Sequence, residues 1–298
     1  MASVTTAQAI AQAIDDFQAS VDSQTQTPQL DIELLLATAT GRSRASLKAF
    51  PERIIEAGPL RQFRDWVARR AQGEPVAYLL SERGFWTLDL AVSPAVLIPR
   101  PETELLVDLA LQLASAEPDV KPWQVADLGT GSGAIALALA SEKPHWQVWA
   151  TDISDAALAV ARENADRLKL PIQFAQGAWT AALPDSSRWN MIVSNPPYIS
   201  DQDPHLAQGD LRFEPRSALV AADDGFQDLY IIASQAADLL VAGGWLLLEH
   251  GHAQGSELRR RLQALGYVDV NTVRDLAGHE RVTTGRRPAV TGEDDTHA

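Results

Sequence analysis

The stretch that decides the fold class is Val125-Ala126-Asp127-Leu128-Gly129-Thr130-Gly131-Ser132-Gly133. Its apolar first half is typical of a buried strand, and a helix is expected directly after it, at Ala134–Glu142. Glycines let the backbone turn tightly and approach a ligand without a Cβ in the way. Open α/β sheets bind ligands at the carboxyl ends of their strands. The loop therefore predicts a ligand site at Gly129, Thr130, Gly131, Ser132 and Gly133.

The segments around this loop alternate between strand and helix patterns. Strands are expected at Gln124–Leu128, Gln147–Thr151, Ile172–Ala175, Met191–Ser194 and Trp245–Glu249. Helices are expected at Pro101–Ala114, Ala134–Glu142, Gln227–Val241 and Ser256–Leu265, and Ser154 is expected to cap a further helix that runs to about Leu168. Two further strands, Val268–Val273 and Val282–Thr284, are expected to form a terminal hairpin. This alternation predicts an α/β fold with a mostly parallel sheet that helices cover on both faces.

The residues before this region have a helical pattern. Its apolar stripes are Ile10, Ile14, Phe17 and Val21 in one helix, Ile32, Leu35, Leu36 and Ala39 in a second, and Leu60, Phe63 and Val67 in a third. The second helix is expected between a cap at Thr27-Pro28 and a stop at Gly41. The domain assignment is a small helical bundle at 1–84, a hairpin or linker at 85–98, the α/β domain at 99–286 and a disordered polar tail at 287–298.

Composition narrows the function classes. The chain has no cysteine, which excludes disulfides and thiol chemistry, and no apolar run approaches the roughly 20 residues that cross a bilayer. Its first 30 residues lack the pattern of a secretory signal, so a cytoplasmic protein is expected, with no membrane association. A formal net charge of −14 disfavours direct nucleic-acid binding, which depends on lysine and arginine. The histidines lack the spacing of a metal site, so no metal is expected.

Two aspartates accompany the glycine loop. Asp152 follows the next predicted strand, about 20 residues further on, where a carboxylate accepts hydrogen bonds from both ribose hydroxyls of a cofactor. Nicotinamide enzymes and S-adenosylmethionine enzymes share this device, so Asp152 does not separate them. Asp127 precedes the glycines, and two roles stay open for it. It contacts the sulfonium or amino end of the cofactor, or it fixes the loop by accepting bonds from backbone N–H groups.

A second motif, Asn195-Pro196-Pro197-Tyr198, follows the apolar strand Met191–Ser194. Two prolines end the sheet and remove two backbone N–H donors, so the turn exposes carbonyl oxygens. The side-chain oxygen of Asn195 adds another acceptor if its amide is turned that way. The motif is therefore expected to present hydrogen-bond acceptors beside the cofactor loop.

Such acceptors suit methyl transfer to a planar nitrogen. An amide NH₂ is a poor nucleophile because its lone pair is delocalised into the carbonyl. Two acceptors, one for each N–H, hold the nitrogen in line and favour the positive charge that builds on it. Tyr198 is expected to pack against the flat amide or base. The sequence thus predicts an S-adenosylmethionine-dependent methyltransferase with Asn195, Pro196 and Tyr198 as catalytic residues.

These residues resemble class I S-adenosylmethionine-dependent methyltransferases that act on nitrogen. Further segments resemble the release-factor glutamine methyltransferase family (the PrmC/HemK type): Gly73–Pro75, Leu97–Glu104, Asp203–Leu206, Arg212–Pro215, Ala221–Asp223 and Leu248–Gly251. The resemblance extends from the N-terminal helices to about Gly285 and is specific because many segments combine.

The resemblance implies a Rossmann-like, seven-stranded methyltransferase sheet behind an N-terminal helical domain that engages the substrate. The implied substrate is the glutamine of the Gly-Gly-Gln motif in class-1 peptide chain release factors, and the implied product of the cofactor is S-adenosylhomocysteine. Implied cofactor contacts are Asp127, Gly129, Thr130, Gly131, Ser132, Gly133, Asp152, Trp179 and Asn195. Implied substrate contacts are Arg100, Asn195, Pro196, Pro197 and Tyr198. The chain departs from the family at Ala178, where an acidic residue is frequent. A monomer is expected.

Three other functions stay open on the residues alone. An adenine methyltransferase acting on DNA or RNA meets a similar planar NH₂ on a flipped base, although the acidic charge argues against it. A regulator that binds S-adenosylmethionine without catalysis would not need an intact Asn-Pro-Pro-Tyr motif. A nicotinamide dehydrogenase would need a proton relay that the sequence does not suggest.

Overall fold

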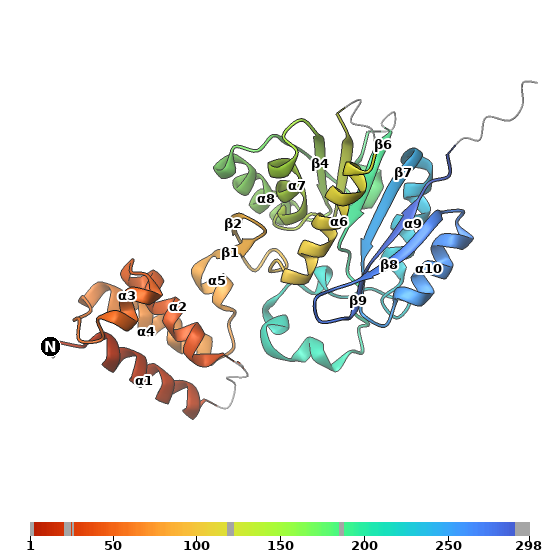
Figure 1. The fold of residues 1–298 in the computed structure, drawn as a ribbon. Helices are drawn as coiled ribbons and strands as arrows, with labels where there is room; N and C mark the ends of the chain where they lie inside the picture. Colours follow the sequence, from red (N-terminus) through yellow and green to blue (C-terminus); the bar gives the residue numbers. More distant parts are fainter. Residues whose placement is uncertain (1–2, 21–24, 26, 118–121, 185–187, 290–298) are drawn as a thin grey trace, which may run out of the picture. The chain divides into compact units, whose positions relative to one another are not determined.

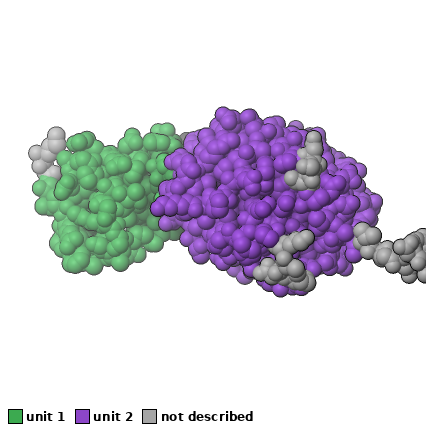
Figure 2. Space-filling view, turned by 90° about the horizontal axis from the view of Figure 1, so that it is seen from above, with its two compact units in different colours: residues 1–82, 204–214 green, residues 83–203, 215–298 purple. Residues whose placement is uncertain are grey.

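The computed structural model describes residues 3–20, 25, 27–117, 122–184 and 188–289. The chain divides into two compact units, coloured separately in Figure 2. The helical unit contains residues 1–82 and 204–214, and the α/β unit contains residues 83–203 and 215–298. Within the described part of the chain, no helix is both long and apolar enough to cross a membrane.

The helical unit consists of short helices around one apolar core (Figure 1). Its elements are α1 (Thr6–Ala19), α2 (Pro28–Thr40), α3 (Arg44–Ala49), α4 (Ala57–Ala71), α5 (Val76–Leu80) and the 3-10 turns η3 (Pro204–Ala207) and η4 (Gly209–Phe213). Pro28 opens α2 and Gly41, at φ +63°, ends it, as the sequence predicts. Phe17, Phe63 and Val67 are buried in the core. Val21 of the first predicted stripe lies outside the described residues.

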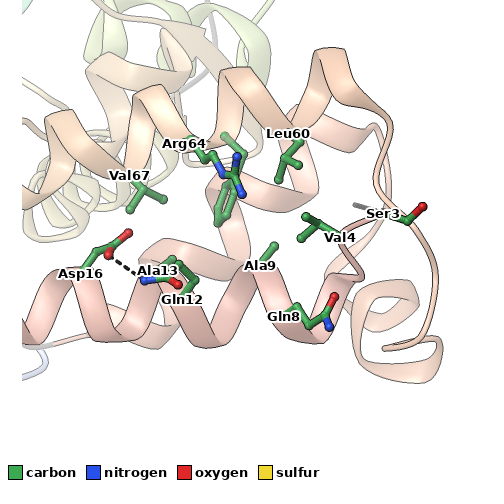
Figure 3. Close-up of a pocket in the computed structure, with 11 residues that line it drawn as sticks. Ser3, Val4, Gln8, Ala9, Gln12, Ala13, Asp16, Leu60, Arg64 and Val67 are labelled. Carbon is green, nitrogen blue, oxygen red and sulfur yellow. Dashed lines mark hydrogen bonds between the residues drawn. The ribbon is translucent and has the colours of Figure 1, made fainter. Parts of the chain in front are cut away.

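A groove lies between α1 and α4 on this unit (Figure 3). The small side chains of Ala9 and Ala13 on α1 face Leu60 and Val67 on α4, which leaves a cavity of about 450 Å³. Gln12 donates to Asp16 along its rim at 3.0 Å. The α1 face of the bundle is therefore less completely filled than its centre.

The insertion 204–214 belongs to the helical unit, although the sequence assigns it to the α/β domain. Arg70 on α4 explains why, because its guanidinium donates to Asp31 at 2.9 Å and to Asp210 of the insertion at 2.9 Å. It also donates to the backbone carbonyls of Gly73 and Glu74. We call Arg70, Asp31, Asp210 and these two carbonyls the Arg70 cluster. A buried cation requires such partners, so the insertion completes the bundle.

Gly73 shows how closely the insertion packs within the helical unit. Its φ is +97°, a conformation that side chains with a Cβ rarely adopt. A Cβ at this position would also lie 3.3 Å from the aromatic ring of Phe213 and would collide with the guanidinium of Arg212. Only glycine therefore fits where α4 meets the insertion.

The α/β unit is a seven-stranded sheet with helices on both faces and a separate hairpin (Figure 1). Its strands are β1 (Glu82–Phe85), β2 (Leu88–Ala91), β3 (Gln124–Leu128), β4 (Gln147–Asp152), β5 (Ile172–Gln176), β6 (Trp189–Ser194), β7 (Leu240–Glu249), β8 (Val268–Arg274) and β9 (Glu280–Arg286). Its helices are η1 (Pro101–Thr103), α6 (Glu104–Ser115), α7 (Ala134–Glu142), α8 (Asp155–Leu168), η2 (Trp179–Ala182), η5 (Arg216–Ala218), α9 (Gln227–Leu239) and α10 (Gly255–Ala264). The strand order is β5-β4-β3-β6-β7-β9-β8, with β9 antiparallel to both of its neighbours.

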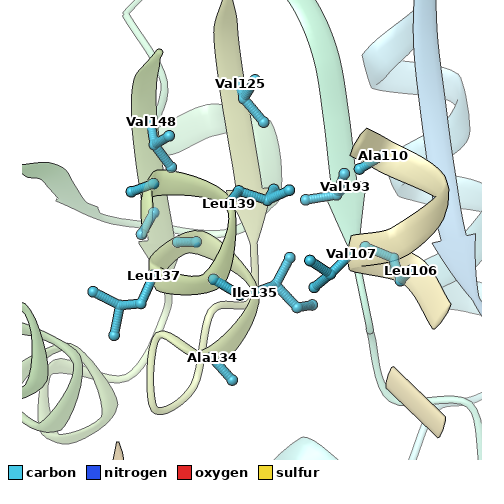
Figure 4. Close-up of a cluster of buried hydrophobic side chains, with 14 of the residues drawn as sticks. Leu106, Val107, Ala110, Val125, Ala134, Ile135, Leu137, Leu139, Val148 and Val193 are labelled. Carbon is cyan, nitrogen blue, oxygen red and sulfur yellow. The ribbon is translucent and has the colours of Figure 1, made fainter. Parts of the chain in front are cut away.

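Two apolar layers cover this sheet because successive strand residues point to opposite faces. Val125 packs with α6 and α7 on one face, where Figure 4 shows Val107, Ile135 and Val193 together. Ala126 and Leu128 belong to the other cluster, which α9 and α10 cover. The α/β fold with a mostly parallel sheet is confirmed.

Several element boundaries differ from the sequence prediction, and the start of β7 differs most. The helix expected to reach Val241 ends at Leu239, and β7 begins at Leu240 rather than at Trp245. Leu240 is fully buried and pairs with Trp189 of β6. The register with β6 shifts after this pair, and the backbones of Gly243 and Gly244 instead form hydrogen bonds with the backbone of Arg287. Glycine has a weak strand preference, so the sequence gives no strand signal here.

Candidate active site

The sheet brings the two sequence motifs together at one edge. β3 lies between β4 and β6, and all three strands are parallel. The glycine loop follows β3, Asp152 ends β4, and Asn195 directly follows β6. The order along the sheet reverses between β3 and β6, which is the position where open α/β folds bind ligands. The topology therefore explains why residues about 65 positions apart in sequence share one site.

A cavity of about 430 Å³ opens at this edge of the sheet. It is lined by these residues from the expected site: Arg100, Gly129, Thr130, Gly131, Ser132, Asp152, Trp179, Asn195, Pro196 and Pro197. Asp127, Gly133 and Tyr198, which the structure also describes, lie outside the lining. The cavity further contains Thr103, Ala178 and Asp228, which the residue patterns did not single out.

Gly129 and Trp179 form one wall together. Gly129 has φ +73°, and a Cβ there would lie 3.0 Å from Cζ3 of the Trp179 indole. The indole N–H of Trp179 donates to Asp228. Burial raises the pKa of this carboxyl above its ordinary value, although the bond from Trp179 acts in the opposite direction. The ring is thus fixed against the glycine loop, where it presents a flat apolar surface.

Asp152 supports the loop that it faces. One carboxylate oxygen accepts from the backbone N–H of Gly131 at 3.0 Å, and the other accepts from that of Ser154 at 2.9 Å. Each carboxylate oxygen has a second lone pair. Asp152 therefore fixes the glycine loop and keeps acceptor capacity toward the cavity.

Asp127 is buried completely behind the loop. Its Oδ2 accepts from the Thr130 hydroxyl at 2.6 Å and from the backbone N–H of Ala136 at 3.2 Å. Burial raises the pKa of this carboxyl to about 7, against the effect of both hydrogen bonds. These contacts correspond to the loop-fixing alternative for Asp127.

Asn195 is held from one side. Its Nδ2 donates to the Thr103 hydroxyl oxygen at 3.1 Å, which leaves the Oδ1 of the same amide as an acceptor. The hydroxyl of Tyr198 donates to Glu249 Oε1 at 3.4 Å, and burial raises the pKa of that tyrosine. The hydroxyl of Tyr198 thus faces the end of β7, and its side chain is not part of the cavity lining.

Comparison with known proteins gives the family. A PrmC N-terminal domain model matches residues 8–80, and a methyltransferase small domain model matches residues 104–213. A release factor glutamine methyltransferase of Pseudomonas aeruginosa is 52% identical over 87% of this chain and 92% of its own length. One from Vibrio cholerae is 48% identical over 95% of this chain and 97% of its own. The chain belongs to the release factor glutamine methyltransferase family.

A solved structure supports the fold of this family member. A methyltransferase from Pyrococcus furiosus superposes with a TM-score of 0.51 at 18% identity, covering 74% of this chain and 97% of that one. At this identity the likeness concerns the fold alone. The class I methyltransferase fold that the sequence implied is confirmed.

Family-specific segments meet around the catalytic motif. Gln254 is buried, and its Nε2 donates to the carbonyl of Tyr198 at 3.2 Å while its Oε1 accepts from the N–H of Gly251 at 2.8 Å. Thr103 comes from the segment Leu97–Glu104 and Glu249 from Leu248–Gly251. The resemblance marked those two segments, but no residue pattern indicated that their side chains reach Asn195 and Tyr198.

Proposed function

We propose that this release factor glutamine methyltransferase uses S-adenosylmethionine to methylate the glutamine side chain of the Gly-Gly-Gln motif in class-1 release factors, in the cytoplasm. The helical unit would serve to engage the release factor. The observation that supports the chemistry best is the bond from Asn195 Nδ2 to Thr103, because it keeps the amide oxygen of Asn195 as an acceptor in the cavity.

The cofactor would occupy the part of the cavity between the glycine loop and Asp152. The spare lone pairs of Asp152 suit two ribose hydroxyls, and the Trp179 ring suits a flat base. Ala178 lines the same wall, so this chain would recognise adenine there without an acidic side chain at that position. When bound, S-adenosylmethionine supplies a methyl group on a positively charged sulfur.

The glutamine amide would lie between Asn195 and Pro196. One N–H donates to Asn195 Oδ1 and the other to the carbonyl of Pro196, which fixes the nitrogen in line with the methyl group. The bound cofactor would supply the methyl carbon to the amide nitrogen and leave as S-adenosylhomocysteine, while the nitrogen would lose one of its two protons to water. Both acceptors favour the positive charge that builds during transfer.

Replacement of Asn195 tests this arrangement. Asn195→Ala should slow single-turnover methyl transfer to release factor by about 100- to 1,000-fold, since it removes one oriented transition-state hydrogen bond. Asn195→Asp keeps an acceptor but buries a charge, so its rate should lie between those of the wild type and the alanine variant. Transfer by Asn195→Ala at the wild-type rate would disprove the acceptor role. Labelled methyl on DNA instead of release factor would overturn the substrate.

Replacement of Asp152 tests the cofactor site. Asp152→Ala should weaken binding of S-adenosylmethionine by about 3 kcal/mol, because two charge-assisted hydrogen bonds are lost. Asp152→Asn keeps the shape and is expected to bind with intermediate affinity. Titration calorimetry with unchanged affinity for both variants would place the ribose elsewhere.

A further inference from the structure

Glu249 lies at the end of β7 and is 1% exposed. Its carboxyl accepts hydrogen bonds from Thr103, the partner of Asn195, and from Tyr198, the last residue of the Asn195–Tyr198 motif. Its Oε2 has no hydrogen-bond partner among the described residues. A buried carboxylate with an unsatisfied oxygen costs free energy, so its presence beside a catalytic motif requires a reason.

The direction of the hydrogen bonds supplies that reason. An ionised carboxylate only accepts, so the single proton of the Thr103 hydroxyl must point to Glu249. The Thr103 oxygen can then only accept from Asn195, and the partner must be Nδ2 rather than Oδ1. The charge on Glu249 therefore determines which end of the Asn195 amide faces Thr103. The opposite orientation would turn the acceptor away from the substrate.

We propose that Glu249 is a positioning residue, which acts through Thr103 to hold the Asn195 amide with its oxygen toward the substrate. This inference rests on the proposed function, in which that oxygen binds the glutamine amide. Thr103 is 4% exposed, so bulk water does not compete strongly for its hydroxyl. Glu249 itself never contacts the substrate in this scheme.

The groups around Glu249 make the orientation of the Asn195 amide sensitive to pH. Burial raises the pKa of its carboxyl to about 7; Thr103, Arg281 and Tyr198 act against this shift, and Glu102 adds to it. Ionisation of Glu249 with rising pH should therefore increase the fraction of enzyme with a correctly oriented Asn195. Asp127 titrates in the same range, so the two carboxyls have to be distinguished by substitution.

The test is Glu249→Gln, which preserves shape while changing hydrogen-bond direction. The new NH₂ donates to Thr103, whose proton is then free to turn to Asn195 Oδ1 and occupy the acceptor. Single-turnover transfer should fall about 10- to 100-fold. The affinity for S-adenosylmethionine and the thermal midpoint should stay near the wild-type values, and the rise in rate near neutral pH should disappear.

Thr103 variants provide the matched controls. Thr103→Val should cost a similar factor, Thr103→Ser should recover most of that loss, and Glu249→Gln should add little in the Thr103→Val background. A wild-type rate and pH profile in Glu249→Gln would overturn the proposal if Asn195→Ala is slow in the same assay. If Asn195→Ala is fast as well, the proposed acceptor mechanism itself has failed.

Discussion

The two units each bury one polar cluster, and the clusters differ in how well their charges are satisfied. In the helical unit, Arg70 is 8% exposed and bonds to two carboxylates and two carbonyls. In the α/β unit, Glu249 and Asp127 are buried with one oxygen each that has no partner among the described residues, and both have a pKa raised to about 7.

The difference separates architecture from chemistry. A buried charge that is fully paired holds parts of the fold together, and it keeps one protonation state. A buried carboxyl with one unpaired oxygen has a pKa raised toward neutral pH. Such a pKa is useful only where protonation or hydrogen-bond direction matters. Buried polar groups without a full set of hydrogen-bond partners are expected at functional sites. The Arg70 cluster thus holds the helical unit together, and the two carboxyls with an unpaired oxygen lie beside the candidate active site.

The largest effect should come from breaking the Arg70 cluster. Arg70→Ala leaves Asp31 buried without its cation, which should destabilise the helical unit by about 3–5 kcal/mol. Its neighbour Arg69 pairs with Glu74 on the surface and is 45% exposed, so Arg69→Ala should cost less than about 1 kcal/mol. Urea unfolding of both variants makes the comparison. Equal losses would mean that burial does not distinguish the two arginines.

Asp127 should give a smaller, pH-dependent effect. The folded state keeps its proton up to about pH 7, whereas the unfolded carboxyl ionises near its ordinary pKa of 3.8, so stability falls as pH rises between those values. Asp127→Asn cannot ionise and should show a flatter profile. The difference between the two proteins should change by about 3 kcal/mol from roughly pH 5 to 8. Parallel stability curves from urea titrations would contradict the raised pKa.

Tyr198 should give the smallest effect. Tyr198→Phe removes a hydroxyl whose bond to Glu249 is long, at 3.4 Å, and keeps the ring. Single-turnover methyl transfer should slow by less than about fivefold, because weak hydrogen bonds contribute about 1 kcal/mol or less. A loss as large as that of Thr103→Val would instead make Tyr198 the main partner of Glu249.

Local signals made most of the fold predictable. The glycine loop, the Ser154 cap of α8 and the strand before Asn195 were identified correctly because each depends on neighbouring residues. The start of β7 was missed because it depends on the pairing of Leu240 with Trp189 and on hydrogen bonds of Gly243 and Gly244 with Arg287, whereas glycine has a weak strand preference. The assignment of 204–214 to the helical unit depends on Arg70, a contact across 140 residues.

In the candidate site, too, the residues that follow strands were predictable, and the residues that act through long-range side-chain contacts were not. Asp152 and Asn195 follow strands, so their meeting at one edge of the sheet follows from topology. Thr103, Asp228, Glu249 and Gln254 act through side-chain contacts that no spacing in the sequence encodes. The hydrogen-bond partners of a buried glutamate depend on the packed structure, so the unpaired oxygen of Glu249 could not be predicted from the sequence.

The path of the chain through the helical unit limits how this enzyme can be recombined. After the Asn195–Tyr198 motif the backbone leaves the α/β unit at Asp203, contributes η3 and η4 to the helical unit and returns at Pro215. A chimera that exchanges only residues 1–82 would combine a foreign α4 with the native insertion, and Arg70, Gly73 and Asp210 would no longer be matched. Exchanging the helical unit for that of a relative therefore requires both pieces, with joins on either side of 204–214 as well as near residue 82.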